Sequence, residues 1–310
     1  MRTLRFHEHG PALDVLRLEE AEPPVPGPGQ IRIAVQACGL NPADWALCEG
    51  LFAGELPRGI GLEVSGTVDA IGEGVAGVAI GDPVLGPAPF LGPTAGAAEQ
   101  ALLDVWFPRP AGLDPVAAAA LPMAVETACR GLRALGVCDG AEGKTVLVHG
   151  AGTTVGYAAV QIAMEHGARV LATAGETYAK ELRALGAEVT GYGEGMAERV
   201  TGLAGGPVDL AFDAAPVSGA LPVLLQTVRS PRDVLTVSDF GSAKELGARF
   251  SGPGGEGTIS NDVLGHYARL AAEGRFSVPV ARSLPLAGWR EGVEASLSGR
   301  ARGKLVLRIG

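Results

Sequence analysis

The sequence predicts an α/β protein in which a doubly wound parallel sheet is inserted into a β-rich, barrel-like domain. Three observations support this prediction. Short strand patterns separated by Gly/Pro turns fill the N-terminal third, as in residues 30–37. Strand and helix patterns alternate from about residue 145 to residue 250, which is typical of a mainly parallel sheet. The chain ends on a further strand pattern, residues 304–309, which indicates a return to the first domain.

The elements follow one another in a regular order. Residues 30–37 and 63–70 predict strands in the N-terminal part, the first by its alternation of apolar and polar side chains. A helical pattern covers residues 114–135, with Asp114 as a plausible N-cap and Pro115 as the first helical residue. The strands expected next are residues 146–149, 170–173, 188–191, 208–212 and 234–237, and a helix over residues 261–273 precedes the last strand.

The composition indicates a globular protein and excludes several classes of partner. The chain has 310 residues, enough for two domains, and 47% of them are hydrophobic. Its formal net charge of −9 argues against binding to nucleic acid or to an anionic membrane surface. It has no apolar span of about 20 residues, and its four cysteines show no CxxC spacing. We therefore expect a cytoplasmic protein that binds neither nucleic acid nor membranes.

The most informative stretch is residues 145–173, where a strand, a glycine-rich turn, a helix and a second strand follow within about 30 residues. Such a unit binds a dinucleotide because the backbone N–H groups at the helix N-terminus approach the pyrophosphate closely. The glycine pattern departs from the usual one. Val155 takes the third glycine position in the frame that starts at Gly150, and Thr153 takes the middle position in the frame that ends at Gly156. The motif alone leaves an ordinary strand–helix turn as an alternative.

Six short motifs occur along the chain in a fixed order. They lie at residues 39–45 (GLNPADW), 61–68 (GLEVSGTV), 81–84 (GDPV), 126–128 (ETA), 150–156 (GAGTTVG) and 303–307 (GKLVL). In these motifs the chain resembles the medium-chain dehydrogenase/reductase superfamily, specifically its zinc-independent quinone oxidoreductase branch. The resemblance covers essentially the full length. It implies a Rossmann dinucleotide-binding domain over residues 119–259, inserted into a GroES-like catalytic domain made of residues 1–118 and 260–310.

The same motifs predict that the chain holds no zinc. By the resemblance, Asn41 stands where zinc-dependent relatives have a catalytic cysteine, and Leu62 stands where they have a histidine before the glutamate. Their structural zinc lobe needs four closely spaced cysteines, which this chain lacks. Because a Lewis-acid centre requires such ligands, we expect no metal site.

The end of the second strand of the dinucleotide unit indicates the choice of cofactor. A carboxylate at this point bonds the adenosine ribose and rejects a 2′-phosphate. Here the strand end runs from Thr173 to Gly175 without an acid, although Glu176 follows as a first-turn helix residue. Lys180 is expected within reach of the phosphate, and Tyr192 is placed near it by the resemblance. We therefore expect NADPH rather than NADH.

The expected cofactor site combines this region with the glycine-rich loop. The Thr153 and Thr154 hydroxyls, although bulkier than glycine, can donate to a phosphate oxygen. The carboxyl-end rule adds the ends of the later strands, and the resemblance places Lys304 near the pyrophosphate. The full set is Gly152, Thr153, Thr154, Val155, Gly156, Thr173, Gly175, Lys180, Tyr192, Ala214, Ser238 and Lys304.

The chemistry that remains without zinc is the reduction of a quinone or an α,β-unsaturated carbonyl by hydride transfer, since such substrates carry their own electron sink. By the resemblance, Asn41 and Thr127 are the catalytic candidates that donate hydrogen bonds to the developing oxyanion. Asn41 has an alternative role as a turn residue before a proline. Asp44 is expected to brace its loop. Trp45 is the third catalytic candidate, and it is either a cleft wall or a core anchor.

Other interpretations stay open. The branch often has a tyrosine and an arginine where this chain has Ala46 and Cys48, which favours a roomier pocket and a bulky aromatic substrate. An enoyl-thioester reductase, or a weakly catalytic NADPH-binding protein, would share the same fold. By the resemblance we expect a homodimer that pairs through an exposed strand edge near residues 234–240.

Overall fold

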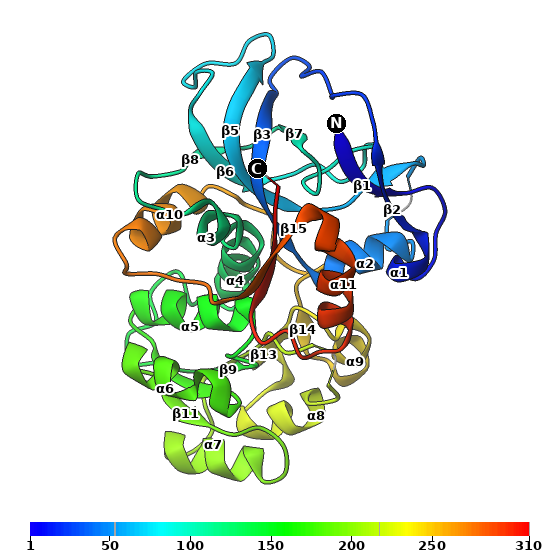
Figure 1. The fold of residues 1–310 in the computed structure, drawn as a ribbon. Helices are drawn as coiled ribbons and strands as arrows, with labels where there is room; N and C mark the ends of the chain where they lie inside the picture. The colour runs from blue at the N-terminus through cyan, green and yellow to red at the C-terminus, as the bar shows by residue number, and fades with distance from the viewer. Residues whose placement is uncertain (53, 217, 310) are drawn as a thin grey trace. The chain divides into compact units, whose positions relative to one another are not determined.

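The computed structural model describes residues 1–52, 54–216 and 218–309. The chain divides into two compact units (Figure 1). The first, which we call the mixed-sheet unit, consists of Met1–Met123 and Leu264–Gly310. The second, the parallel-sheet unit, consists of Ala124–Val263.

The mixed-sheet unit is built on a sheet of strand order β15-β16-β3-β5-β6-β8, with β7 also paired to β3. The strands expected at residues 30–37 and 63–70 are β3 and β5, and the C-terminal strand is β16. Strand β16 runs antiparallel to β3, which runs antiparallel to β5. The bounds are β3 Ile31–Leu40, β5 Glu63–Ile71, β6 Pro83–Pro87, β7 Gln100–Leu103, β8 Phe107–Pro108, β15 Val280–Pro285 and β16 Lys304–Arg308.

A smaller sheet of order β2-β1-β4 and several short helices complete this unit. Its core gathers apolar side chains from both sheets and from α2 and α11, among them Phe6, Ile33, Trp45 and Trp289. The further elements are β1 Arg2–Phe6, α1 Ala12–Val15, β2 Leu16–Glu20, α2 Pro42–Cys48, β4 Arg58–Gly59, α3 Pro115–Ala119, α10 Leu264–Ala272, the 3-10 turn Leu286–Gly288 and α11 Trp289–Leu297.

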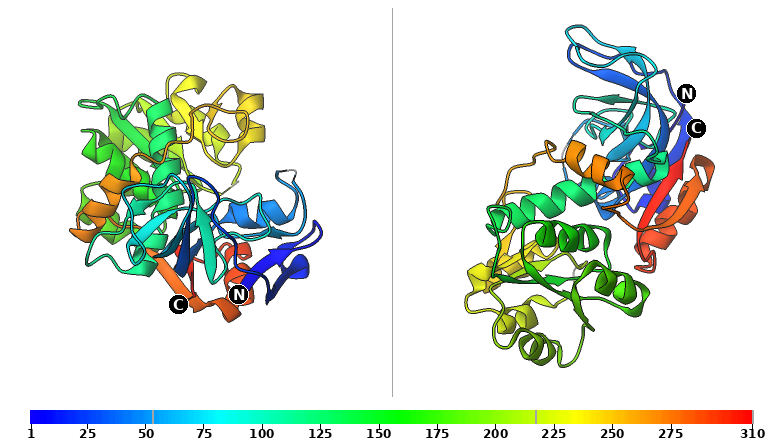
Figure 2. Two further views of the ribbon diagram at one scale, coloured as in Figure 1. Left: turned by 90° about the horizontal axis from the view of Figure 1, so that it is seen from above. Right: turned by 90° about the vertical axis from the view of Figure 1, so that its left-hand side faces the viewer.

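The parallel-sheet unit has strand order β11-β10-β9-β12-β13-β14, and every pair in it is parallel. In order along the chain this is 3-2-1-4-5-6, the doubly wound arrangement that places ligands at the carboxyl ends of the strands. Helices flank the sheet (Figures 1 and 2). The strands are β9 Thr145–His149, β10 Arg169–Thr173, β11 Glu188–Thr190, β12 Leu210–Asp213, β13 Val234–Thr236 and β14 Arg249–Phe250.

The helices of this unit cover an apolar core that includes Leu147, Leu171, Val200 and Leu224. Their bounds are α4 Pro122–Ala134, which contains the division between the units, α5 Thr154–Glu165, α6 Glu176–Leu185, α7 Met196–Ala204, α8 Leu221–Leu224, α9 Phe240–Leu246 and the 3-10 turns Leu225–Thr227 and Pro231–Asp233.

Two sequence-based expectations differ from the structure. The helix expected over residues 114–135 is broken into α3 and α4, because Pro122 has no N–H to continue the first helix and restricts the residue before it. The strand near residues 234–240, expected to be an exposed edge, is β13, which pairs with β12 on one side and β14 on the other. The edge strand on that side of the sheet is therefore β14.

No helix in the described ranges is both long and apolar enough to cross a membrane.

Candidate functional site

The loop between β9 and α5 is shaped by two glycines that tolerate no side chain. Gly150 has φ +73°, and a Cβ there would lie 2.6 Å from the backbone N of Ala215. A Cβ on Gly156 would lie 2.2 Å from the carbonyl oxygen of Gly150. Gly152 differs, since its Cβ would meet only Tyr178, at 3.7 Å. The loop therefore folds back tightly on the first turn of α5 and on the end of β12.

Thr153 is the N-cap of α5. Its Oγ1 accepts a hydrogen bond from the backbone N of Gly156 at 3.0 Å and donates one to the carbonyl oxygen of Ala214 at 3.1 Å. The hydroxyl proton that the sequence assigned to a phosphate oxygen is thus used inside the protein. The amides of Thr154 and Val155, which come before the first intrahelical bond, remain at the helix N-terminus, where anions bind.

Thr173, at the end of β10, and His149, at the end of β9, support this loop. Thr173 is fully buried at the end of β10, and its Oγ1 lies 2.7 Å from Nδ1 of His149. The backbone N of Ala151 donates to the carbonyl oxygen of Thr173 at 3.0 Å. Burial lowers the pKa of His149 from 6.5 to about 4, so its ring is neutral near pH 7. His149 was not among the residues predicted from the sequence, although a polar residue at the end of each of two adjacent strands was the available signal.

Gly175 and Tyr192 lie next to each other in the part of the predicted cofactor site where the 2′-phosphate is expected. Gly175 is the N-cap of α6, and a Cβ there would lie 3.5 Å from the hydroxyl of Tyr192. Tyr192 is 63% exposed, and Lys180 is exposed on α6. The guanidinium of Arg199, which sequence reasoning missed, donates to the carbonyl oxygens of Glu194 at 2.7 Å and of residue 191 at 3.1 Å. These bonds hold the loop that carries Tyr192.

The ends of β12 and β13 carry the remaining predicted residues of this unit. Ala214 is buried, and Ser238 donates from its hydroxyl to the carbonyl oxygen of Ala215. Beside them the Oδ2 of Asp213 accepts a hydrogen bond from Thr236 Oγ1 at 2.8 Å. Burial raises the pKa of Asp213 to about 6, against the effect of these hydrogen bonds. The ends of β12 and β13 are therefore joined by one bond between side chains and one from a side chain to the backbone.

In the mixed-sheet unit, the structure brings Asn41 and Lys304 together with a residue that the sequence did not single out, Glu63. Lys304 Nζ donates to Asn41 Oδ1 at 2.6 Å and forms an ion pair with Glu63 Oε1. Asn41 Nδ2 donates to the same Glu63 oxygen at 2.9 Å. Lys304 is thus a buried residue of this unit, whereas the glycine-rich loop belongs to the other unit.

Asp44 braces the start of α2, as the sequence predicts. Its Oδ2 accepts from the backbone N of Asn41 and its Oδ1 from the backbone N of Gly61, both at 2.7 Å. Burial raises the pKa of Asp44 to about 7; the two backbone N–H groups and Lys304 oppose this shift, and Glu63 adds to it. Cys38 lies nearby, and burial raises its thiol pKa well above the ordinary value, so it is no ready thiolate.

The other two catalytic candidates lie in different surroundings. Trp45 is 4% exposed and belongs to the apolar core, and its Nε1 donates to Ser296 Oγ in α11 at 2.8 Å. Of the two roles left open for it, the structure favours the core anchor. Thr127 lies half-buried on α4 in the parallel-sheet unit. Within the described ranges, no three His, Cys, Asp or Glu side chains group so that they could hold a metal ion.

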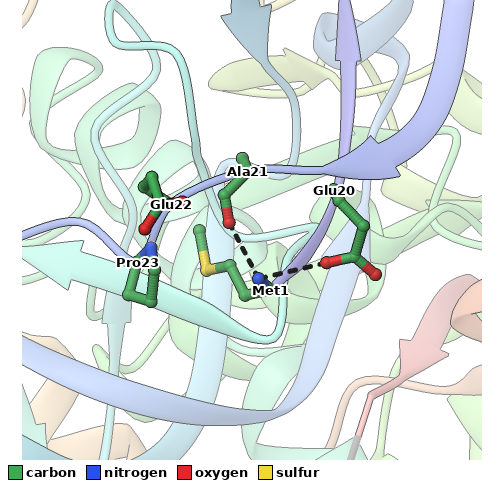
Figure 3. A pocket seen from close by; sticks show the side chains of 5 residues that line it. All are labelled: Met1, Glu20, Ala21, Glu22 and Pro23. Atoms are coloured by element: carbon green, nitrogen blue, oxygen red, sulfur yellow. Dashed lines mark hydrogen bonds and ion pairs between the residues drawn. The ribbon is translucent and has the colours of Figure 1, made fainter.

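None of these residues lines the surface pocket of about 360 Å³ that is shown in Figure 3. Its lining residues are Met1, Glu20, Ala21, Glu22 and Pro23. The terminal ammonium of Met1 donates to the carbonyl oxygen of Ala21 at 2.8 Å and pairs with Glu20 at 3.2 Å. The ammonium in this pocket is therefore already paired.

Comparison with known proteins identifies a matching domain family and a similar enzyme. Residues 27–103 match the family described as the alcohol dehydrogenase GroES-like domain. The chain is 37% identical to the quinone oxidoreductase of Rattus norvegicus over 187 residues, which cover 59% of this chain and 55% of that protein. The chain therefore spans about half the length of the curated relatives it matches.

Two solved structures resemble the whole chain. The crystal structure of an NAD-dependent alcohol dehydrogenase has a TM-score of 0.86 at 28% identity, with 100% of both chains covered. The quinone oxidoreductase from Coxiella burnetii has a TM-score of 0.82 at 27% identity, with 100% of this chain and 99% of that chain covered. With its GroES-like segment and its parallel 3-2-1-4-5-6 sheet, the chain belongs to the medium-chain dehydrogenase/reductase superfamily.

Proposed function

We propose that this protein is an NADPH-dependent oxidoreductase that reduces a quinone or an α,β-unsaturated carbonyl by hydride transfer without zinc. The observation that carries the proposal is the loop after β9, where Gly150 and Gly156 leave no room for a Cβ beside the N-terminus of α5. In this proposal the parallel-sheet unit binds the cofactor, and the mixed-sheet unit supplies the group that stabilises the reduced substrate.

The residues of the loop fit a dinucleotide. Thr153 satisfies the amide of Gly156, and the amides of Thr154 and Val155 stay available for the pyrophosphate. Bound NADPH would supply the hydride. The neutral His149 and the buried Thr173 hold the loop from beneath and bring no charge to it.

The preference for NADPH rests on the end of β10 and the start of α6. No carboxylate ends β10, so nothing there repels a 2′-phosphate. Tyr192 adjoins Gly175, the N-cap of α6, and Lys180 lies exposed on α6. A charged donor to a phosphate contributes about 1.5–3 kcal/mol, so we expect NADPH to bind at least roughly ten-fold more tightly than NADH. Equal dissociation constants in fluorescence titrations would contradict this preference.

The substrate side requires a hydrogen-bond donor for the oxygen that becomes negative. Asn41 Nδ2 has two N–H groups and donates one of them to Glu63. The other is the donor that we assign to the enolate or hydroquinone oxygen. A donor of this kind stabilises the transition state more than the neutral substrate, which is what a rate increase requires. No ligand set for zinc is needed for this chemistry.

The experiment that tests the proposal is the steady-state oxidation of NADPH with a panel of quinones, enones and enoyl thioesters. We expect turnover with quinones or enones, including bulky aromatic ones. A strong preference for enoyl thioesters would favour the enoyl-thioester reductase instead. Tight NADPH binding without oxidation by any acceptor would support a binding protein and would contradict the enzyme.

A further inference from the structure

Three neighbouring strands bring one buried polar cluster together. Lys304 begins β16, Asn41 follows β3, and Glu63 begins β5. The ladders pair residue 305 with residue 40 and residue 39 with Glu63, so register alone places the three side chains side by side. The side chains of Lys304 and Glu63 are 1% and 0% exposed. Ion pairs buried to this degree need well-satisfied partners to offset the loss of hydration.

The groups around the cluster leave room for the Glu63 carboxylate and bind its second oxygen. Gly39 makes room for the Glu63 carboxylate, because a Cβ on Gly39 would lie 2.5 Å from Glu63 Oε1. The second oxygen of Glu63, Oε2, accepts from the backbone N of Met123 at 2.8 Å. Both carboxylate oxygens are therefore bound, and the carboxylate cannot rotate without losing a partner.

The two charges determine the orientation of the Asn41 amide. The ammonium of Lys304 has only donors, so it requires the amide oxygen, which lies 2.6 Å away. The ionised carboxylate of Glu63 has only acceptors, so it requires the amide nitrogen, at 2.9 Å. A flipped amide would set N–H groups against the ammonium and oxygen against the carboxylate. One orientation is thus strongly favoured, and it leaves a single N–H of Nδ2 unbound within residues 1–52, 54–216 and 218–309.

We propose that Lys304 is a positioning residue which, together with Glu63, fixes and polarises the Asn41 amide so that its one remaining N–H is directed to the substrate oxygen. This inference rests on the proposed function, in which Asn41 touches the substrate. A cation at the amide oxygen draws electron density from the nitrogen and strengthens the remaining N–H as a donor. Lys304 thereby acts on the reaction through Asn41 and not by contact with the cofactor.

The first test needs no activity. The side-chain amide signals of Asn41 are identified by NMR as those missing in Asn41→Ala. In the parent protein we expect one protected N–H and two well-separated proton shifts. In Lys304→Met, and in the charge-neutral Lys304→Met/Glu63→Gln, the signals should shift and the protected N–H should exchange with solvent at least ten-fold faster. Lys144→Met is the matched control, because Lys144 also donates to a carbonyl oxygen, that of Gly136, but lies in the parallel-sheet unit.

The second test is a cycle of kinetic measurements with an accepted quinone or enone. The Lys304→Met/Glu63→Gln variant removes both buried charges together, which avoids the large destabilisation that follows when one is left alone. We expect kcat to fall about ten-fold or more, with the KM for NADPH unchanged. In the Asn41→Ala background the same double change should alter kcat by less than about two-fold, because its effect passes through Asn41.

The outcomes separate the inference from the proposed function. Unchanged Asn41 amide signals in both variants would overturn the inference, and so would a loss of kcat that is fully retained in the Asn41→Ala background. If none of the tested acceptors supports NADPH oxidation by the parent protein, the proposed function fails. The NMR test still decides whether Lys304 orients the amide.

Discussion

Asn41 and Thr153 are both N-cap residues of a helix, but their side chains have different hydrogen-bond partners. The Thr153 hydroxyl caps α5 and donates a hydrogen bond to the carbonyl oxygen of Ala214. At Asn41 the backbone N is bound by Asp44, and the side-chain amide is bonded to Lys304 and Glu63. The same position in a helix thus yields a structural residue in one unit and a candidate donor in the other.

Replacing Asn41 by alanine should lower turnover and leave cofactor binding intact. The lost hydrogen bond to the developing oxyanion is worth about 1.5–4 kcal/mol, so kcat should fall roughly 10- to 1,000-fold while the dissociation constant of NADPH stays the same. Steady-state kinetics and a fluorescence titration measure the two quantities. Asn261→Ala, at the chain's other asparagine, is the matched control. Full activity of Asn41→Ala on every accepted substrate would return Asn41 to the role of a turn residue.

His149 should stay neutral down to unusually low pH. Burial lowers its pKa from 6.5 to about 4, so the folded protein binds this proton less readily than the unfolded chain does. The stability that His149 contributes is present above about pH 6.5 and is lost as the pH falls toward about 4. An NMR titration of its ring signals checks this, with a midpoint near 6.5 as the contrary result. His149→Gln should remove that part of the acid sensitivity of the thermal midpoint.

At the scale of elements, the turn between β9 and α5, where we propose that the cofactor binds, is too tight for side chains at two positions. Gly150 and Gly156 each face backbone atoms closer than 3 Å to an added Cβ, whereas Gly152 does not. Thr153, which takes a usual glycine position, is accommodated because its hydroxyl caps α5 and bonds the carbonyl oxygen of Ala214. The degenerate fingerprint is therefore consistent with the normal backbone path.

Gly156→Val should abolish cofactor binding, and Gly152→Ala should leave it nearly unchanged. A Cβ on Gly156 would lie 2.2 Å from the carbonyl oxygen of Gly150, so the loop must move away from the helix N-terminus, where we propose that the pyrophosphate binds. At Gly152 the nearest atom to a Cβ is 3.7 Å away. Fluorescence titration with NADPH compares the two variants, and far-UV circular dichroism checks folding. Parent-like affinity of a folded Gly156→Val protein would refute the assignment of the loop.

The sequence predicted the elements well where local patterns determine them. The strands at residues 30–37, 63–70 and 304–309 and the glycine-rich strand–turn–helix are found close to their expected bounds. It did not predict the partners of Lys304, because the contact with Asn41 spans 263 residues and depends on the pairing of β16 with β3. Glu63 was missed for the same reason. His149 had a signal in the sequence, a polar residue at the end of each of two adjacent strands, and the partners of Arg199 lie only five and eight residues away along the chain.

At the scale of the whole molecule, β14 is the edge strand of the parallel sheet on the side of β13, since β13 is paired on both sides. An exposed edge presents unpaired backbone groups and favours pairing with a second chain. We predict a homodimer, with a mass by light scattering of about twice the 31.4 kDa of one chain. A value near one chain mass across a wide concentration range would contradict it.

The central claim, direct hydride transfer to a quinone or enone without zinc, is tested most directly with NADPH that carries deuterium at both C4 positions. The protein is first analysed for metals and then incubated with this cofactor and an enone, and the product is examined by mass spectrometry. The account predicts one deuterium on the β-carbon of the product, no stoichiometric zinc, and a rate that chelators leave unchanged. One zinc per chain that activity requires, or a reduced product without deuterium, would contradict it.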